Sequence, residues 1–204
     1  MTRRFTGDTL VVATHNRGKA AELAELLRDF NVHILSHADL GLEVPEETGT
    51  TFLDNAELKA RAAAVTTGMP SLADDSGITV DALEGAPGIH TADWGGPDRD
   101  WMLAMRRVNE ELDARGVAHT AEARAAAFVC ALALCWPDGH CERFLGRMPG
   151  HVVWPPRGTF GHGYDPMFVP AGHSTTFAEM APAAKNQVSH RGHAFRQLVA
   201  ACFS

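Results

Sequence analysis

The chain has 204 residues, of which 45% are hydrophobic and 21% charged, and its formal net charge at pH 7 is −7. This composition is ordinary for a globular protein, and no apolar run approaches the roughly 20 residues needed to cross a bilayer. The negative charge argues against nucleic-acid binding through a basic surface, although local basic residues can hold one small phosphorylated ligand. We expect one domain, residues 1–204, with a small-molecule partner and neither a nucleic-acid nor a membrane partner.

The four cysteines show no pattern of a metal site or a disulfide framework. The cysteines are Cys130, Cys135, Cys141 and Cys202. They have neither C-x-x-C spacing nor histidines at the distances typical of a zinc finger. We therefore expect buried thiols in a reducing compartment. The N-terminal residues contain no apolar segment typical of an export signal, so the sequence predicts a cytoplasmic protein.

The first elements are a strand, a loop and a helix. Residues 9–14 are apolar and β-branched, which predicts a buried strand, and a helix follows with one apolar stripe: Leu23, Leu26, Leu27 and Phe30. The connection is Thr14-His15-Asn16-Arg17-Gly18-Lys19. Backbone N–H groups at a helix start lack helical partners and favour a phosphate. This is not a P-loop, and an ordinary turn with Asn16 starting the helix is an alternative of about equal weight.

An acidic pair precedes the next predicted helix. A second strand is expected at 32–35, and Glu46-Glu47 then leads to Thr51-Phe52-Leu53-Asp54, which resembles a capping box. Small residues allow that helix to pack closely before Gly68 ends it. Acids at this place can simply complement the helix dipole, so the pattern alone does not require a functional role.

A second acidic pair stands between two short apolar runs. Asp74-Asp75-Ser76-Gly77 follows residues 72–73 and precedes residues 78–80, which predicts a strand ending in a turn. Because two adjacent carboxylates repel, we expect a metal or a basic side chain against them. A solvated turn is the alternative.

The second half contains a hairpin, a Gly-rich loop and a basic segment. An apolar run at 125–136, a turn at 137–139 and a return at 140–145 predict a β-hairpin. Gly158–Pro166 predicts a flexible, exposed loop able to lie against a flat ligand, with a plain surface loop as the alternative. Lys185 and Ser189-His190-Arg191-Gly192 then stand before a final helix.

In combination these segments resemble the inosine-triphosphate pyrophosphatase family, whose bacterial members are dITP/XTP pyrophosphatases. The resemblance extends over almost the whole chain and rests on an ordered set of motifs: Thr14-His15-Asn16-Arg17-Gly18-Lys19, Glu46-Glu47-Thr48-Gly49, Ala73-Asp74-Asp75-Ser76-Gly77, Ala86-Pro87-Gly88-Ile89, Gly163-Tyr164-Asp165-Pro166, Lys185 and Ser189-His190-Arg191-Gly192.

The resemblance implies an elongated α/β fold with a mixed central sheet flanked by helices, two lobes with an active-site cleft between them, a Mg²⁺ cofactor and a homodimer. It implies hydrolysis of non-canonical purine nucleoside triphosphates (dITP, ITP, XTP and dXTP) to the monophosphate and pyrophosphate. By motif, Glu47 and Asp75 would bind Mg²⁺, and Asp75 would also act on water. The other expected substrate-binding residues are Thr14, His15, Asn16, Arg17, Gly18, Lys19, Ser76, His162, Gly163, Tyr164, Asp165, Lys185, His190 and Arg191.

Two departures from the family pattern concern the expected base pocket. His162 stands where bacterial members commonly have Phe, so stacking on the purine would fall to an imidazole unless Phe160 or Tyr164 replaces it. His90 and Asp93 likewise replace an aromatic and a cation. Two alternative functions remain at this stage: a non-hydrolytic nucleotide sensor on the same scaffold, and a pyrophosphatase for other modified nucleotides.

Overall fold

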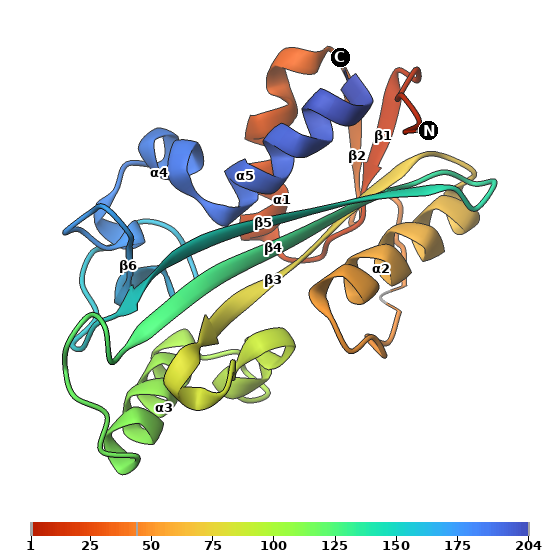
Figure 1. Cartoon of the computed structure of the whole chain (residues 1–204). Helices are drawn as coiled ribbons and strands as arrows, with labels where there is room; N and C mark the ends of the chain where they lie inside the picture. The colour runs from red at the N-terminus through yellow and green to blue at the C-terminus, as the bar shows by residue number, and fades with distance from the viewer. Residues whose placement is uncertain (1, 44, 204) are drawn as a thin grey trace. The chain divides into compact units, whose positions relative to one another are not determined.

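A computed structural model of the chain describes residues 2–43 and 45–203 (Figure 1). Within them lie six strands, five α-helices and several short 3₁₀ turns. The strands are β1 (Thr9–Val12), β2 (His33–Ser36), β3 (Ser71–Val80), β4 (Ala125–Cys135), β5 (Cys141–Val152) and β6 (Phe168–Pro170). The α-helices are α1 (Arg17–Leu27), α2 (Phe52–Thr67), α3 (Trp101–Ala114), α4 (Pro182–Val188) and α5 (His190–Leu198), and a π-helical turn follows at Val199–Phe203.

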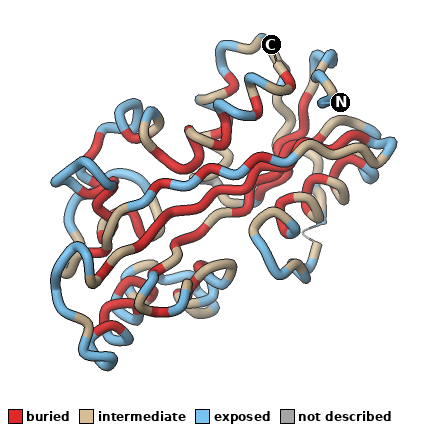
Figure 2. Tube along the Cα trace, viewed as in Figure 1, coloured by how far each residue is buried: buried red, intermediate tan, exposed pale blue. Residues whose placement is uncertain are grey.

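The strands form one mixed sheet in the order β2-β1-β3-β4-β5-β6. β1 pairs in parallel with β2 and β3, whereas β5 pairs antiparallel with β6. β4 is buried over nearly its whole length, as Figure 2 shows. The predicted α/β class, with a mixed sheet flanked by helices, is confirmed.

Local signals in the sequence set the helix ends. The Thr51 hydroxyl accepts a hydrogen bond from the backbone N–H of Asp54 at the start of α2, and Asp100 caps α3 in the same way. Gly68 ends α2 in the left-handed conformation that glycine adopts without steric cost. The predicted start and end of α2 are confirmed.

The chain divides into two compact units. Unit 1 comprises Met1–Asp75, Cys130–Gly146 and Gly192–Ser204. Here strand side chains alternate between two faces. One face carries larger apolar residues of β1, β3 and β4, which pack on α1 and α5: Leu10, Val12, Leu72, Leu132 and Leu134. The other face is mostly alanine and packs on the alanines of α2: Ala13, Ala73, Ala131, Ala133, Ala56, Ala60, Ala63 and Ala64.

Unit 2 comprises Ser76–Val129 and Arg147–Arg191. Its core joins α3 to the parts of β3, β4 and β5 that belong to this unit. Met105, Val108 and Leu112 of α3 are buried in this core, and Trp101 packs against it. Phe128, Phe168 and Phe177 form an aromatic group inside the core.

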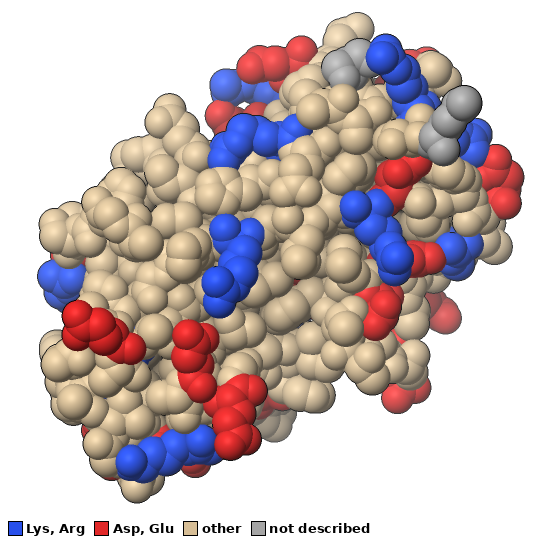
Figure 3. Space-filling model, viewed as in Figure 1, with Lys and Arg blue, Asp and Glu red and all other residues tan. Residues whose placement is uncertain are grey.

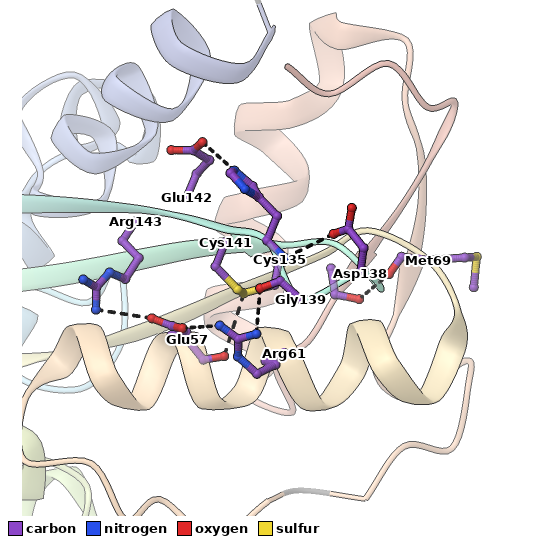
Figure 4. Close-up of a disulfide and its surroundings, with 11 residues drawn as sticks. Glu57, Arg61, Met69, Cys135, Asp138, Gly139, Cys141, Glu142 and Arg143 are labelled. Atoms are coloured by element: carbon purple, nitrogen blue, oxygen red, sulfur yellow. Dashed lines mark hydrogen bonds and ion pairs between the residues drawn. A yellow bond between two sulfur atoms is a disulfide. The ribbon is translucent and has the colours of Figure 1, made fainter. Parts of the chain in front are cut away.

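The β4–β5 hairpin corrects the expectation for two cysteines. Cys135 ends β4, Cys141 begins β5, and the intervening turn brings their Cα atoms to 4.1 Å. The two form a disulfide (Figure 4). Beside it, Arg61 of α2 donates to the carbonyl of Gly139 and pairs with Glu57. A spacing of six residues, uninformative as a motif, becomes a close pair once the hairpin forms; Cys130 and Cys202 are buried thiols, as expected.

The surface carries charges of both signs. On the face drawn in Figure 3, basic and acidic side chains are interspersed rather than segregated, so that face presents no large field of one sign. No helix among residues 2–43 and 45–203 is long and apolar enough to span a membrane.

The disulfide predicts a thiol count. Protein unfolded in guanidinium without reductant should react with a thiol reagent at two cysteines, Cys130 and Cys202, and at four after reduction. Peptide mapping by mass spectrometry identifies the paired cysteines. Four reactive thiols before reduction would contradict the pairing.

Candidate active site

The acidic pair Asp74-Asp75 lies inside a strand rather than at its end. β3 runs unbroken from Ser71 to Val80, so the predicted turn is wrong. Neighbouring side chains of a strand point to opposite faces, and each carboxylate has its own lysine: Asp74 lies 2.7 Å from Lys19 Nζ, and Asp75 lies 2.9 Å from Lys59 Nζ. Each carboxylate therefore has the basic side chain that the sequence led us to expect. Because both negative charges are paired, the strand continues through the two aspartates.

Lys59 is a site residue that the sequence reasoning missed. Its ammonium lies 2.6 Å from Glu47 Oε1 and 2.9 Å from Asp75 Oδ1, and the residue is only 8% exposed. In the sequence, Lys59 falls between Ala56 and Ala63 at the spacing of the buried helix stripe. A lysine on such a stripe is buried and needs acidic partners. Its position on the stripe is therefore the feature of the sequence that predicts its pairing with acidic residues.

Burial and charge act in opposite directions on this cluster. Burial raises the pKa of Asp75, and the nearby ammonium groups of Lys59 and Lys19 offset only part of that effect. For Lys59, burial favours the neutral form, but Asp75 and Glu47 raise its pKa overall. Lys59 is therefore a permanent cation at neutral pH, whereas Asp75 is a stronger base than an ordinary aspartate.

The loop before α1 is built around Asn16. Its side-chain oxygen accepts hydrogen bonds from the backbone N–H groups of Gly18 and Lys19, at 3.0 and 3.2 Å. The helix-starting role of Asn16 is confirmed, but these two N–H groups already have a partner, contrary to the expectation that the loop offers them unpaired. Thr14 accepts from the backbone N–H of Asn16. The side chain of Arg17 lies outside the described residues, so its role stays a prediction.

A cavity of about 390 Å³ adjoins this cluster in unit 1. Lys59, His15 and His37 contribute to its wall, and the two imidazole rings meet edge to face at 6.1 Å. The Lys59 ammonium and the two imidazole rings can donate hydrogen bonds to an anion of several oxygens, and Glu43 is the acidic residue of the same wall.

The residues predicted to read the base lie in unit 2, and the structure brings two pairs of them together. Lys185 Nζ lies 2.7 Å from Asp165 Oδ2, and Arg191 donates to the Ser76 hydroxyl at 3.0 Å. His190 stacks on Phe128 with centroids 4.6 Å apart. Asp165, Lys185, His190 and Arg191 are at most 4% exposed.

Residues 158–161 of the Gly-rich loop are exposed, as expected, but Asp165 is not. It is 1% exposed, and its Oδ2 also accepts from the backbone N–H of His162 at 2.8 Å. Gly161 leaves room for this carboxylate, since a Cβ there would lie 2.0 Å from Asp165 Oδ2. The loop therefore folds around the Asp165 side chain.

The aromatic residues of this loop differ in accessibility. Tyr164 is 1% exposed, and its hydroxyl donates to the backbone carbonyl of Thr91. Phe160 is 51% exposed. His90 and Asp93, the two residues that differ from the family pattern, are exposed, and His90 Nδ1 lies 3.0 Å from Asp93 Oδ2.

Three comparisons place these observations among known proteins. A model of the Ham1 family matches residues 10–201. A dITP/XTP pyrophosphatase of Rhodospirillum centenum is 56% identical over 99% of this chain and 98% of its own, and one of Ruegeria pomeroyi is 54% identical over 100% and 99%. A solved HAM1 protein of Coxiella burnetii has a TM-score of 0.85 at 39% identity, covering 94% of this chain and 96% of its own.

The pKa of Asp75 predicts how Asp75→Asn changes stability. Burial raises the pKa of Asp75 in the folded state above the value of 3.8 in the unfolded chain. At a pH between these two pKa values, Asp75 is therefore protonated in the folded state and ionised in the unfolded chain. The resulting stabilisation is full below pH 3.8 and is lost as the pH rises through the folded pKa. The thermal midpoint of Asp75→Asn relative to wild type should therefore increase between about pH 4 and 7.

This comparison is made by calorimetry in the presence of a chelator. The exposed Asp98→Asn variant is the control, and it should show no such trend. A difference between Asp75→Asn and wild type that stays flat or declines with pH would contradict the assigned effect of burial.

Asp165→Asn should destabilise the protein. It leaves the buried Lys185 ammonium without a counter-charge, and removing one partner of a buried ion pair costs about 3 kcal/mol. Urea denaturation measures the loss, with Asp93→Asn, expected within about 0.5 kcal/mol of wild type, as the matched control. Equal unfolding free energies for the two variants would refute a structural role for the Asp165–Lys185 pair.

Proposed function

The chain belongs to the Ham1 family, and we propose that it hydrolyses the non-canonical purine nucleoside triphosphates dITP, ITP, XTP and dXTP to monophosphate and pyrophosphate. This activity would remove such nucleotides from the cellular pool. The observation that carries the proposal is the Glu47–Lys59–Asp75 cluster, in which Lys59 and Asp75 are buried and Glu47 is exposed, with Lys19 close to it. The relatives that are 56% and 54% identical are named dITP/XTP pyrophosphatases.

The carboxylates Glu47 and Asp75 fit a Mg²⁺ site. They converge on one cation, the Lys59 ammonium, and Asp75 Oδ2 is a buried oxygen without a hydrogen-bond partner among the described residues. Residues 2–43 and 45–203 contain no group of three or more His, Cys, Asp or Glu side chains able to hold a metal. Mg²⁺ commonly uses one or two carboxylates together with substrate phosphates. When bound, it would neutralise phosphate charge and lower the pKa of nearby water.

The protein's own groups then have distinct tasks in the proposal. Asp75, made more basic by burial, accepts a proton from the water that attacks the α-phosphorus. Lys19 and Lys59 place fixed positive charge against the triphosphate, and Thr14, His15, Asn16, Arg17 and Gly18 form the loop that holds its tail. Pyrophosphate leaves from the α-phosphorus.

The proposed base recognition uses unit 2. Hypoxanthine and xanthine present O6 and N1–H, whereas adenine presents an amino group and a bare N1. In the proposal, Asp165 accepts from N1–H, His190 or Arg191 donates to O6, and Ser76, His162, Gly163, Tyr164 and Lys185 complete the contacts. Adenine offers no N1–H to Asp165 and presents an amino group to the donor, so it would lose both of these hydrogen bonds, which permits discrimination of about 10⁴. Among the stacking candidates, the exposure of Phe160 favours it over the buried Tyr164.

Three broader statements complete the proposal. Residues 1–204 act as one catalytic domain, since the family model spans residues of both units. The substrate, a free nucleotide, favours a cytoplasmic location; the cysteine pattern no longer supports it, because Cys135 and Cys141 are paired. We also propose that the protein is a homodimer and that it binds neither nucleic acid nor a membrane.

A panel of nucleoside triphosphates with Mg²⁺, scored separately for pyrophosphate and orthophosphate, tests this function. ITP, dITP and XTP should yield pyrophosphate, and ATP and GTP should be poor substrates. Modified pyrimidine triphosphates are included because a preference for them would favour the alternative specificity. Orthophosphate as the first product would refute the reaction, and binding without any product would favour a sensor.

Asp75→Asn serves as the catalytic control in the same panel. Loss of a general base lowers turnover by about 10²–10⁴-fold, and single-turnover measurements with ITP isolate that step. Near-normal hydrolysis by folded Asp75→Asn protein would end the assignment of Asp75.

A further inference from the structure

Asp74 is the acid of the Asp74-Asp75 pair that the proposed reaction does not use. Its side chain is fully buried, and its two oxygens have different partners. Oδ1 lies 2.7 Å from the Lys19 ammonium, and Oδ2 accepts a hydrogen bond from the Cys130 thiol at 3.0 Å. We propose that Asp74 is a positioning residue that holds the Lys19 ammonium where the triphosphate binds. This inference rests on the proposed role of Lys19.

The chemistry of lysine explains why such a residue is needed. A lysine side chain has four rotatable bonds and loses roughly 2 kcal/mol of rotamer entropy when it is fixed. A carboxylate that already fixes it in the free protein removes this cost from substrate binding. Lys19 keeps 16% of its side chain exposed, so the ammonium remains accessible to a phosphate while Asp74 holds it from the buried side.

Cys130 supports the same geometry from β4. Its thiol donates to the Asp74 oxygen that does not face Lys19, which restrains rotation of the carboxylate. β4 is a central strand and Cys130 is fully buried, so the support is rigid. The resulting order is thiol, carboxylate, ammonium, with only the last group reaching solvent.

A double-mutant cycle tests the inference. The variants are Asp74→Asn, Lys19→Met and the combination, and the readouts are dissociation constants for an α,β-imido analogue of ITP and for IMP. Asp74→Asn should weaken the analogue about tenfold and leave IMP within about twofold, because IMP lacks the phosphates assigned to Lys19. In the Lys19→Met background, Asp74→Asn should have no further effect, since residues that act through one another are not additive.

The controls separate the possible failures. Asp113→Asn removes the carboxylate that pairs with the buried Arg124 in unit 2 and should change stability without changing either dissociation constant. Additive effects, or an equal loss of analogue and IMP binding, would overturn the positioning role. If Lys19→Met alone leaves the analogue unaffected, the assignment of Lys19 in the proposed function is at fault instead, and the positioning role falls with it.

A second variant covers the case in which Asp74→Asn does not fold. Cys130→Ala keeps the carboxylate but removes the hydrogen bond that orients it, and should weaken the analogue by about threefold with IMP unchanged. Cys130→Ser, which retains a donor, should restore the affinity. If Cys130→Ala is folded and binds the analogue as tightly as wild type does, the proposed orientation of Asp74 by the Cys130 thiol would be excluded.

Discussion

Two carboxylates on adjacent residues of a central strand repel each other, and neither remains ionised in a sheet without a cation. The strand resolves the repulsion by its alternation: Asp74 faces Lys19, and Asp75 faces Lys59. Each lysine comes from a different helix, α1 or α2, so the charges of β3 require both helices to lie against the sheet. Packing and electrostatics in unit 1 therefore depend on the same contacts.

Most of the architecture follows from patterns that are visible in the sequence. The stripe of α1, the cap and glycine that bound α2, and the apolar hairpin all specify local structure through nearest neighbours. The acidic pair was misjudged because propensity treats Asp-Asp-Ser-Gly as a turn, whereas contacts from distant residues stabilise it as strand. Local patterns do not predict the role of Lys59 for the same reason, because its partners Glu47 and Asp75 lie 12 and 16 residues away in the sequence.

The Gly-rich loop shows a different limit of sequence reasoning. Its glycines indicated flexibility, yet Gly161 occupies its position because the Asp165 carboxylate leaves no space for a Cβ. A glycine needed for close approach and a glycine needed for mobility look identical in a sequence. The sequence predicted that Asp165 and Lys185 matter, but not that they form one buried pair.

The alanine face between α2 and the sheet has a consequence for the charge cluster. Helix–sheet separation is set by the size of the side chains between the two layers, and here those side chains are mostly single methyl groups. Lys59 stands on the same helix, so the thickness of this layer fixes how far its ammonium reaches toward Asp75. Enlarging any one of these alanines would lift α2 and lengthen a 2.9 Å ion pair without touching a charged residue. The cluster is thus as sensitive to the volume of its uncharged neighbours as to the identity of its own members.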